Sequence, residues 1–251
     1  PDPEIFGKEI NFKPEKIYEL SKNKAYLQRG IRINWECNKS LLNRKSQVPS
    51  KETLIFTKGI EDFLKNEINQ KNIIHEKVCF QSGNLENKKG KIEFALQFNK
   101  EKLRFGKAFC NTVFNMNGGT HDAGFRSGIA KSIRKYAKHK NNKIVSKASQ
   151  DDIFDHTVYI VSVYISDPEF EGQTKHKLSS SFVHKCCDNF TSSTFDEWLN
   201  RNQKAAKNII NVLEEKIREK NIFDLSQNIE RQGLFRKIRL PGKLSDCTSD
   251  K

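Results

Sequence analysis

One apolar stretch, residues 156–166, constrains the fold of this chain more than any other. It reads His-Thr-Val-Tyr-Ile-Val-Ser-Val-Tyr-Ile-Ser, and its β-branched and aromatic residues are typical of a strand. Asp167-Pro168 follows at once, and proline ends a strand because it lacks the amide proton of the ladder and fixes φ. Gly172 adds a second permissive position. The sequence therefore predicts a buried strand that leads into a loop over residues 167–175.

The loop carries three different polar groups in a row. Gln173 has an amide, Thr174 a hydroxyl and Lys175 a cation at the end of a flexible stem. Such a set suits contact with a phosphate, with the lysine acting as a mobile point charge. The alternative is a polar loop that simply faces water, and the chemistry of the three residues alone leaves both interpretations open.

The first part of the chain predicts a helix followed by a strand. Pro14 suits the first turn of a helix and Gly30 ends it. The apolar stripe between them consists of Ile17, Leu20 and Leu27. Residues 31–35 then alternate apolar and polar side chains, as in a half-buried strand. The polar residues 38–50 follow as a linker or loop.

Residues 51–166 predict a mixed α/β region. Residues 53–56 form a short strand, residues 60–68 a helix, and residues 92–98 a strand with one buried face. The polar residues 84–90 form a hairpin-like connection before that strand. Residues 109–113 form a further strand that runs into a turn at Asn117-Gly118-Gly119, where glycine provides the positive φ that a tight turn needs.

The helix expected after this turn has two chemically different sides. Its apolar side consists of Phe125, Ile129, Ile133 and Tyr136. Its basic side consists of Lys131, Arg134, Lys135 and Lys138, with Arg126 at the border. A single sign of charge favours a wall that faces DNA, whereas the alternative is an ordinary solvated helix face. His121, near the start of this helix, is predicted to make a structural polar contact rather than to act as a base.

Two or more helices are expected downstream of the loop. Residues 182–190 form one, and Ser192-Ser193 before an acidic turn resemble the cap of the next. Apolar residues at helical spacing then run through a long charged helix: Ala206, Ile209, Ile210, Leu213 and Ile217. The pattern weakens over residues 221–239, and Pro241-Gly242 ends the element.

Composition limits the class of partner. The 251 residues carry a net charge of +14 with a pI of about 9.5, which favours a polyanion, nucleic acid first and an anionic membrane second, over a merely lysine-rich surface. No apolar run reaches the roughly 20 residues that span a bilayer. The cysteines at 37, 79, 110, 186, 187 and 247 lack metal or disulfide spacing, so we expect reduced thiols, no metal site and a cytoplasmic protein.

Several common enzyme signatures are missing. Gly242-Lys243 lacks the spacing of a phosphate-binding loop and is followed by Leu244 rather than serine or threonine. No Gly-x-Ser-x-Gly elbow occurs. The pair Asp151-Asp152 is typical of a helix start rather than of a catalytic dyad. The residues alone thus describe a basic α/β protein with a lysine placed to contact phosphate.

Three separated motifs resemble one protein family. They are Asp-Pro-x-Phe-x-Gly-Gln-Thr-Lys at 167–175, Gly-Gly-Thr-His-x-x-Gly-Phe-Arg at 118–126 and Leu-Pro-Gly-Lys-Leu-x-Asp-Cys at 240–247. They occur in the order seen in the B subunits of bacterial type II topoisomerases, with the topoisomerase IV branch closest and gyrase B next. The resemblance covers the whole chain but only the middle of such a protein, so we expect a fragment.

The resemblance implies a domain organisation. Residues 1–48 correspond to the end of a GHKL-type ATPase domain, residues 49–220 to the transducer domain, and residues 221–251 to a connector toward the DNA-cleavage core. The transducer fold is α/β, like the second domain of ribosomal protein S5, with a mixed sheet, helices and a long C-terminal helix. The catalytic and metal-binding carboxylates of the family correspond to no position in this chain.

The resemblance also implies a function. In the family, Gln173 and Lys175 correspond to residues that reach the bound ATP, and the lysine contacts the γ-phosphate. ATP binding closes a dimer of B subunits around DNA, and Mg²⁺ is held by residues outside this chain. The partners are DNA and the A subunit, in an A2B2 assembly, with no membrane. The alternative is a non-enzymatic, basic nucleic-acid-binding protein of S5-like fold.

Overall fold

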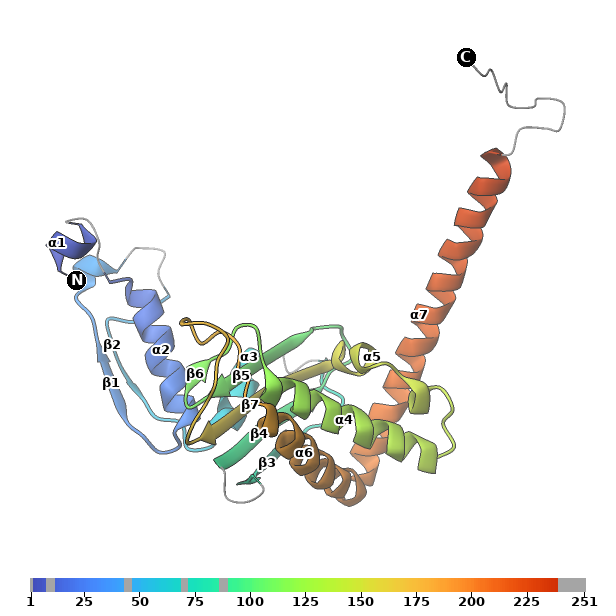
Figure 1. Cartoon of the computed structure of the whole chain (residues 1–251), viewed down its shortest axis with the longest axis horizontal. Helices are drawn as coiled ribbons and strands as arrows, with labels where there is room; N and C mark the ends of the chain where they lie inside the picture. The colour runs from blue at the N-terminus through green and yellow to red at the C-terminus, as the bar shows by residue number, and fades with distance from the viewer. Residues whose placement is uncertain (1, 8–11, 43–46, 69–71, 86–89, 239–251) are drawn as a thin grey trace, which may run out of the picture.

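The computed structural model describes residues 2–7, 12–42, 47–68, 72–85 and 90–238, with side chains described up to Ser226 except those of Pro3 and Phe6. At the N-terminal end, helices α1 (Pro3–Phe6) and α2 (Pro14–Leu27) precede an antiparallel pair of strands, β1 (Ile33–Glu36) and β2 (Lys51–Leu54). The short 3-10 helix η1 (Lys39–Leu41) lies between the two strands. The predicted helix and the two strands are therefore confirmed here, although the second strand spans Lys51–Leu54 rather than residues 53–56 (Figure 1).

A five-stranded mixed sheet forms the centre of the molecule (Figure 1). Its strands are β3 (Cys79–Asn84), β4 (Gly90–Phe98), β5 (Phe105–Cys110), β6 (Val113–Phe114) and β7 (Thr157–Ile165). The order is β3-β4-β7-β5-β6, in which β5 and β7 run parallel and the other neighbours are antiparallel. The mixed α/β class is thus confirmed, and the predicted apolar strand lies at the centre of the sheet.

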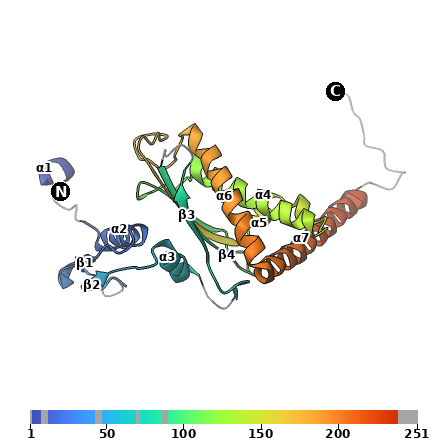
Figure 2. The same cartoon turned by 90° about the horizontal axis from the view of Figure 1, so that it is seen from below.

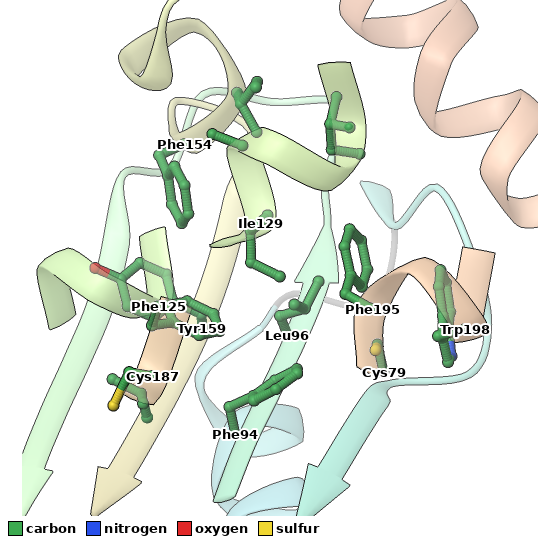
Figure 3. Close-up of a cluster of buried hydrophobic side chains, with 14 of the residues drawn as sticks. Cys79, Phe94, Leu96, Phe125, Ile129, Phe154, Tyr159, Cys187, Phe195 and Trp198 are labelled. Carbon is green, nitrogen blue, oxygen red and sulfur yellow. The ribbon is translucent and has the colours of Figure 1, made fainter. Parts of the chain in front are cut away.

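Strand β7 is buried on both sides because helices cover both faces of the sheet. Tyr159, Val161 and Val163 pack into the core formed with α4 (Thr120–His139) and α6 (Ser181–Arg201) (Figure 3). Val158 and Ile160 point the other way and pack with α3 (Ile60–Glu67). This arrangement explains why the strand lacks an apolar–polar alternation: neither face meets water.

Two predictions about the sheet were wrong in detail. The side chains of Ala95 and Gln97 are buried as well as those of Phe94 and Leu96, so β4 has two covered faces over most of its length. The expected strand over residues 109–113 instead comprises the end of β5, a turn at residues 111 and 112, and the start of β6. Asn111 and Thr112 have φ values of 49° and 65°, a backbone conformation that ends a strand.

The helices after the loop differ from the prediction at one junction. Helix α6 runs without a break through residues 191–194, where a helix cap was expected, because Ser193 and Thr194 donate hydrogen bonds to Phe190 O, one turn back, at 3.0 and 2.8 Å. Helix α7 (Gln203–Ile238) continues well past the apolar stripe and projects away from the sheet (Figure 1). The motif at 240–247 lies outside the described residues.

Two further elements connect α4 to β7. They are η4 (Val145–Lys147) and α5 (Gln150–Phe154), and α5 begins with a capping box formed by Ser149 and Asp152. Asp151-Asp152 is therefore a helix start, as predicted. Seen from below, α4, α6 and α7 lie on one side of the sheet and α2 and α3 on the other (Figure 2). None of the described helices is long and apolar enough to cross a membrane.

One expected core contact is absent. Leu27 at the end of α2 is buried, but the Ile17 and Leu20 side chains of the predicted stripe are 38% and 60% exposed. Only the C-terminal end of α2 is thus buried. Its packing against α3 depends on Tyr26, whose ring stacks on Phe63 at a centroid distance of 4.6 Å.

Candidate functional site

The loop that follows β7 folds back on itself over residues 166–180. Glu171 N donates to Lys177 O at 2.9 Å, and Ser179 N donates to Glu169 O at 2.8 Å. Leu178 lies on the returning arm and is fully buried. The arms of the loop are therefore held by backbone hydrogen bonds and by one core side chain, while residues 172–175 form its tip.

The turn at the start of α4 fixes the returning arm. Leu178 N donates to Gly118 O at 3.2 Å, and Thr120 N donates to Leu178 O at 2.9 Å. Gly118 and Gly119 have φ values of 64° and 138°, so the predicted glycine turn is confirmed. A Cβ on Gly119 would lie 2.4 Å from Leu178 O, which shows how closely the two backbones approach. The turn motif and the loop motif thus meet in space.

The tip presents its polar side chains to solvent. Gln173, Thr174 and Lys175 are all exposed, and the Lys175 ammonium lies 5.9 Å from the centroid of the Phe170 ring. The Lys175 backbone has a φ of 55°, and its carbonyl accepts a hydrogen bond from Asn115 Nδ2 at 2.8 Å. Sequence reasoning placed the three tip residues on a loop and missed Asn115, whose only signal was its place just before the glycine turn.

The basic residues of α4 differ in the groups that they contact. Arg126 pairs with Asp151 at 3.3 Å and its guanidinium lies 4.7 Å from the centroid of the Phe154 ring. Arg134 Nε donates to Ala148 O at 2.8 Å. Both arginines therefore turn toward the segment that leads into α5 and line one cavity of about 530 Å³ there.

The lysines of α4 point elsewhere. Lys131 pairs with Asp188 of α6 at 3.0 Å, and Lys135 pairs with Asp196 of the same helix at 2.6 Å. Lys138 is exposed and has no ion pair within the described part of the chain. The basic residues of α4 thus have different partners: Arg126 and Arg134 contact residues 148–151, and Lys131 and Lys135 pair with α6. Their contact with DNA stays a prediction.

Lys138 offers the cleanest test of that prediction. If its ammonium contacts a phosphate, Lys138→Ala should lower the slope of log affinity against log salt by about 1, because one fewer counterion is released. Binding by fluorescence anisotropy across a salt series measures this slope. Arg134→Ala is a poorer probe since it also removes the bond to Ala148 O. An unchanged slope for Lys138→Ala would remove Lys138 from the DNA contact.

His121 does not make the polar contact that the sequence predicted. Its side chain is fully buried, and within the described residues neither imidazole nitrogen has a hydrogen-bond partner. Burial lowers the pKa of His121 to about 4, so the ring is neutral at pH 7. The histidine therefore packs as an uncharged core residue.

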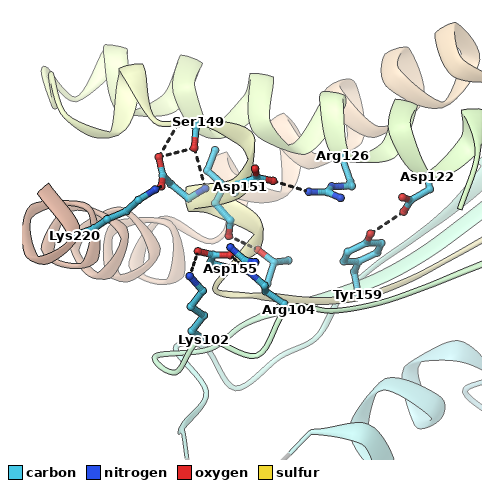
Figure 4. Close-up of polar contacts among 12 residues, drawn as sticks. Lys102, Arg104, Asp122, Arg126, Ser149, Asp151, Asp155, Tyr159 and Lys220 are labelled. Carbon is cyan, nitrogen blue, oxygen red and sulfur yellow. Dashed lines mark hydrogen bonds and ion pairs between the residues drawn. The ribbon is translucent and has the colours of Figure 1, made fainter. Parts of the chain in front are cut away.

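A polar network that the sequence did not reveal links α5 to its neighbours (Figure 4). The Asp155 carboxylate pairs with the Lys102 ammonium at 2.6 Å and also with Arg104. Asp152 pairs with Lys220 of α7 at 2.6 Å. These partners lie far apart in the chain, so no local pattern marks them. The network connects the middle of α7 to the body of the protein.

The ion pairs of Asp155 make the stability of the fold depend on pH in the acid range. Burial raises the pKa of its carboxyl, but hydrogen bonds from Arg104 and Lys102 outweigh burial and hold the pKa below its usual value. Stability from a depressed pKa is present above the unfolded value of about 3.9 and is lost as the pH falls through the folded value. Asp155→Asn should cost about 2 kcal/mol at pH 7 and progressively less below about pH 4. Urea unfolding of the two proteins at neutral pH and at acid pH measures the loss of stability. An equal loss at the two pH values would contradict this expectation.

No group of three or more His, Cys, Asp or Glu in the described part of the chain could hold a metal ion. The five cysteines described form no disulfide with one another, and burial raises the pKa of the Cys110 thiol to about 12. The candidate site is thus the exposed tip at residues 173–175, a cation, an amide and a hydroxyl on a fixed base.

Comparison with known proteins identifies the class to which this fold and loop belong. The family model described as DNA gyrase B matches residues 59–222, from just before α3 into α7. The chain therefore belongs to the DNA gyrase B family. The resemblance found in the three sequence motifs is confirmed.

Curated relatives narrow the similarity further. The B subunit of DNA topoisomerase 4 from Rickettsia bellii is 36% identical over 255 residues, covering 99% of this chain and 37% of that protein. The corresponding protein of Bartonella bacilliformis is 32% identical, and the match covers all of this chain and 36% of that protein. The B subunit of DNA gyrase from Streptococcus pyogenes is 30% identical, covering 100% of this chain and 38% of that protein. The chain thus spans little more than a third of the curated relatives it matches.

Solved structures show the same fold. The 43K ATPase domain of Thermus thermophilus gyrase B superposes with a TM-score of 0.73 at 22% identity, covering 91% of this chain and 59% of that one. The topoisomerase IV ATP-binding domain of Francisella tularensis gives 0.69 at 21% identity, covering 86% and 56%. At such low identity the likeness establishes the architecture alone.

Proposed function

We propose that this chain is the coupling part of the B subunit of an ATP-dependent type II DNA topoisomerase. In this proposal it relays ATP binding and hydrolysis to gate closure and DNA strand passage, in reactions such as relaxation and decatenation. The observation that carries the proposal is the tip at residues 173–175, which is exposed while its base is bonded to the α4 turn. An exposed cation on a fixed base suits a ligand held by another domain.

Lys175 is the residue that acts on the nucleotide in this proposal. Its ammonium contacts the γ-phosphate of ATP and stabilises charge that shifts during phosphoryl transfer, while Gln173 supplies a second contact. Both side chains are exposed and therefore accessible to a neighbouring domain. A compact ammonium on a long stem suits this task because it reaches across a domain boundary without a fixed bonding plane.

The domain organisation is part of the proposal. Residues 1–48 belong to the end of a GHKL-type ATPase domain, 49–220 to an S5-like transducer, and 221–251 to a connector. Pairing of β1 with β2 joins the first two parts, and Tyr164 OH donates to Leu27 O at 2.7 Å. Helix α7 crosses residues 220 and 221 without a break, which suits a rigid link to a further domain.

Cofactors and partners follow from the same proposal. In this proposal ATP binds with Mg²⁺, and the metal ligands lie outside this chain. The macromolecular partners are DNA, the A subunit in an A2B2 assembly, and a second copy of the B subunit once ATP is bound. The net charge of +14 supports contact with a polyanion. Family membership favours this proposal over a non-enzymatic nucleic-acid-binding protein of S5-like fold.

The proposal predicts that this chain alone hydrolyses no ATP. The family's catalytic and metal-binding carboxylates correspond to no part of it, and Lys175 on its own neither cradles ATP nor activates water. A coupled ATPase assay should give background rates for residues 1–251 and turnover for the complete B subunit with its A subunit and DNA. Turnover by the isolated chain that persists through further purification would contradict the proposed division of labour.

A further inference from the structure

Asn115 is held rigidly at the edge of the central sheet, directly after β6. Its backbone nitrogen donates to Ala108 O at 2.9 Å, and its carbonyl accepts from Gly118 N at 2.9 Å. The residue is 1% exposed, so its side chain has little room to change conformation. Asn115 therefore has the fixed position that a residue needs to hold another one in place.

The side chain of Asn115 reaches the tip of the Lys175 loop. Its Nδ2 lies 2.8 Å from the backbone oxygen of Lys175. A carbonyl oxygen only accepts hydrogen bonds, so the amide nitrogen must face it, and the orientation of the amide follows from the contact itself. This bond joins the exposed tip directly to the rigid edge of the sheet.

Lys175 needs such support because its backbone is in the left-handed region. Its φ is 55°, which a side chain with a Cβ adopts only at some cost unless its surroundings hold it. The local backbone contact from Lys175 N to Gly172 O is long, at 3.4 Å. The hydrogen bond from the buried Asn115 side chain to the Lys175 carbonyl stabilises this backbone conformation. It thereby fixes the direction in which the lysine side chain leaves the backbone.

We propose that Asn115 is a positioning residue that holds Lys175 in the backbone conformation from which its ammonium reaches the bound phosphate. The inference rests on the proposed function of Lys175. Asn115 touches the backbone of the loop and acts on the reaction only through Lys175. Its contribution should therefore disappear when the Lys175 side chain is removed.

The test compares Asn115→Ala, Lys175→Ala and the double variant in the complete B subunit, with A subunit and DNA. Asn115→Ala should lower kcat roughly tenfold, the factor that one lost hydrogen bond gives, with little change in KM for ATP. In the Lys175→Ala background the same change should have no further effect. Asn202→Ala is the matched control, because Asn202 Nδ2 donates to Trp198 O at 2.9 Å at the junction of α6 and α7; it should leave kcat unchanged.

A second readout does not depend on catalysis. Trypsin cleavage after Lys175, followed by mass spectrometry of the complete protein, should accelerate roughly tenfold in Asn115→Ala and stay unchanged in Asn202→Ala. Asn115→Leu, which removes the donating nitrogen at nearly equal size without burying a charge, should accelerate cleavage in the same way and serves if the alanine variant fails to fold.

The outcomes distinguish the positioning role of Asn115 from the proposed function of the Lys175 loop. Unchanged trypsin cleavage, or an Asn115→Ala effect on kcat that is undiminished in the Lys175→Ala background, would overturn the positioning role of Asn115. Normal turnover of Lys175→Ala would instead overturn the proposed function of the loop.

Discussion

Replacing Lys175 by alanine in the complete B subunit is expected to lower ATP turnover by roughly 10²–10³-fold, the typical cost of removing one preorganised donor to developing charge. Nucleotide affinity should fall much less, because the base and most phosphate contacts belong to another domain in the proposed arrangement. ATP-driven closure of the dimer should also fail, since the loop would no longer favour the closed state. Steady-state ATPase and nucleotide binding, measured side by side, separate these effects.

Lys177 provides a matched control for this change. It lies two residues from Lys175, is also exposed, and pairs with Glu171 at 2.9 Å. Lys177→Ala should retain near-normal turnover, because an exposed ion pair contributes little. Lys175→Arg should restore only part of the activity, since a planar guanidinium differs in shape from an ammonium. Equal activity for Lys175→Ala and Lys177→Ala would show that the loop is structural.

Replacing Gly119 by alanine should cause the second large effect, on stability. The φ of 138° disfavours any side chain, and the new Cβ would lie 2.4 and 2.5 Å from Leu178 O and N, which are backbone atoms. Strain and overpacking together should cost about 3 kcal/mol. The loop should also separate from the α4 turn. A lower urea midpoint at an unchanged m-value measures the first effect, and faster trypsin cleavage after Lys175 measures the second.

Gly172→Ala separates backbone strain from overpacking as causes of the lower stability. Its φ is 77°, but a Cβ there would meet nothing within 4 Å. Gly172→Ala should therefore cost only about 1 kcal/mol, from backbone conformation alone. If Gly119→Ala were no more harmful than Gly172→Ala, the close approach of the turn to Leu178 would not be what fixes the loop.

Much of the fold was predictable because its strongest signals are local. The apolar run of β7, the proline and glycine at the ends of α2, and the glycine turn before α4 each depend on neighbouring residues. The junction at residues 191–194 was not predictable, because serine and threonine serve equally as helix caps and within helices. The hairpin turn at Asn111 and Thr112 was missed because residues other than glycine seldom have a positive φ. Whether a strand has one covered face or two depends on α3, which is distant from β4 in sequence.

The candidate site was likewise predictable only where its signals are local in the sequence. The three tip residues were found from their order in the chain, since a strand, a proline and a glycine placed them on a loop. Asn115, which holds Lys175, lies 60 positions away and could not be found from local pattern. The ion pairs of the basic side of α4 could not be predicted, because helical periodicity says which residues share a face but not which carboxylates approach them, such as Asp151 and Asp188.

The most direct test of the central claim is whether a bound γ-phosphate covers the Lys175 ammonium. Lysine acylation in the complete B subunit, quantified by mass spectrometry, reports this, because an ammonium held by a phosphate stays protonated and does not react. With a non-hydrolysable ATP analogue, labelling of Lys175 should slow by roughly tenfold or more, the factor that one hydrogen bond to a charged group gives. ADP should give no protection, and the exposed Lys138 should react equally in every state. Equal labelling of Lys175 with the ATP analogue and with ADP would contradict the account.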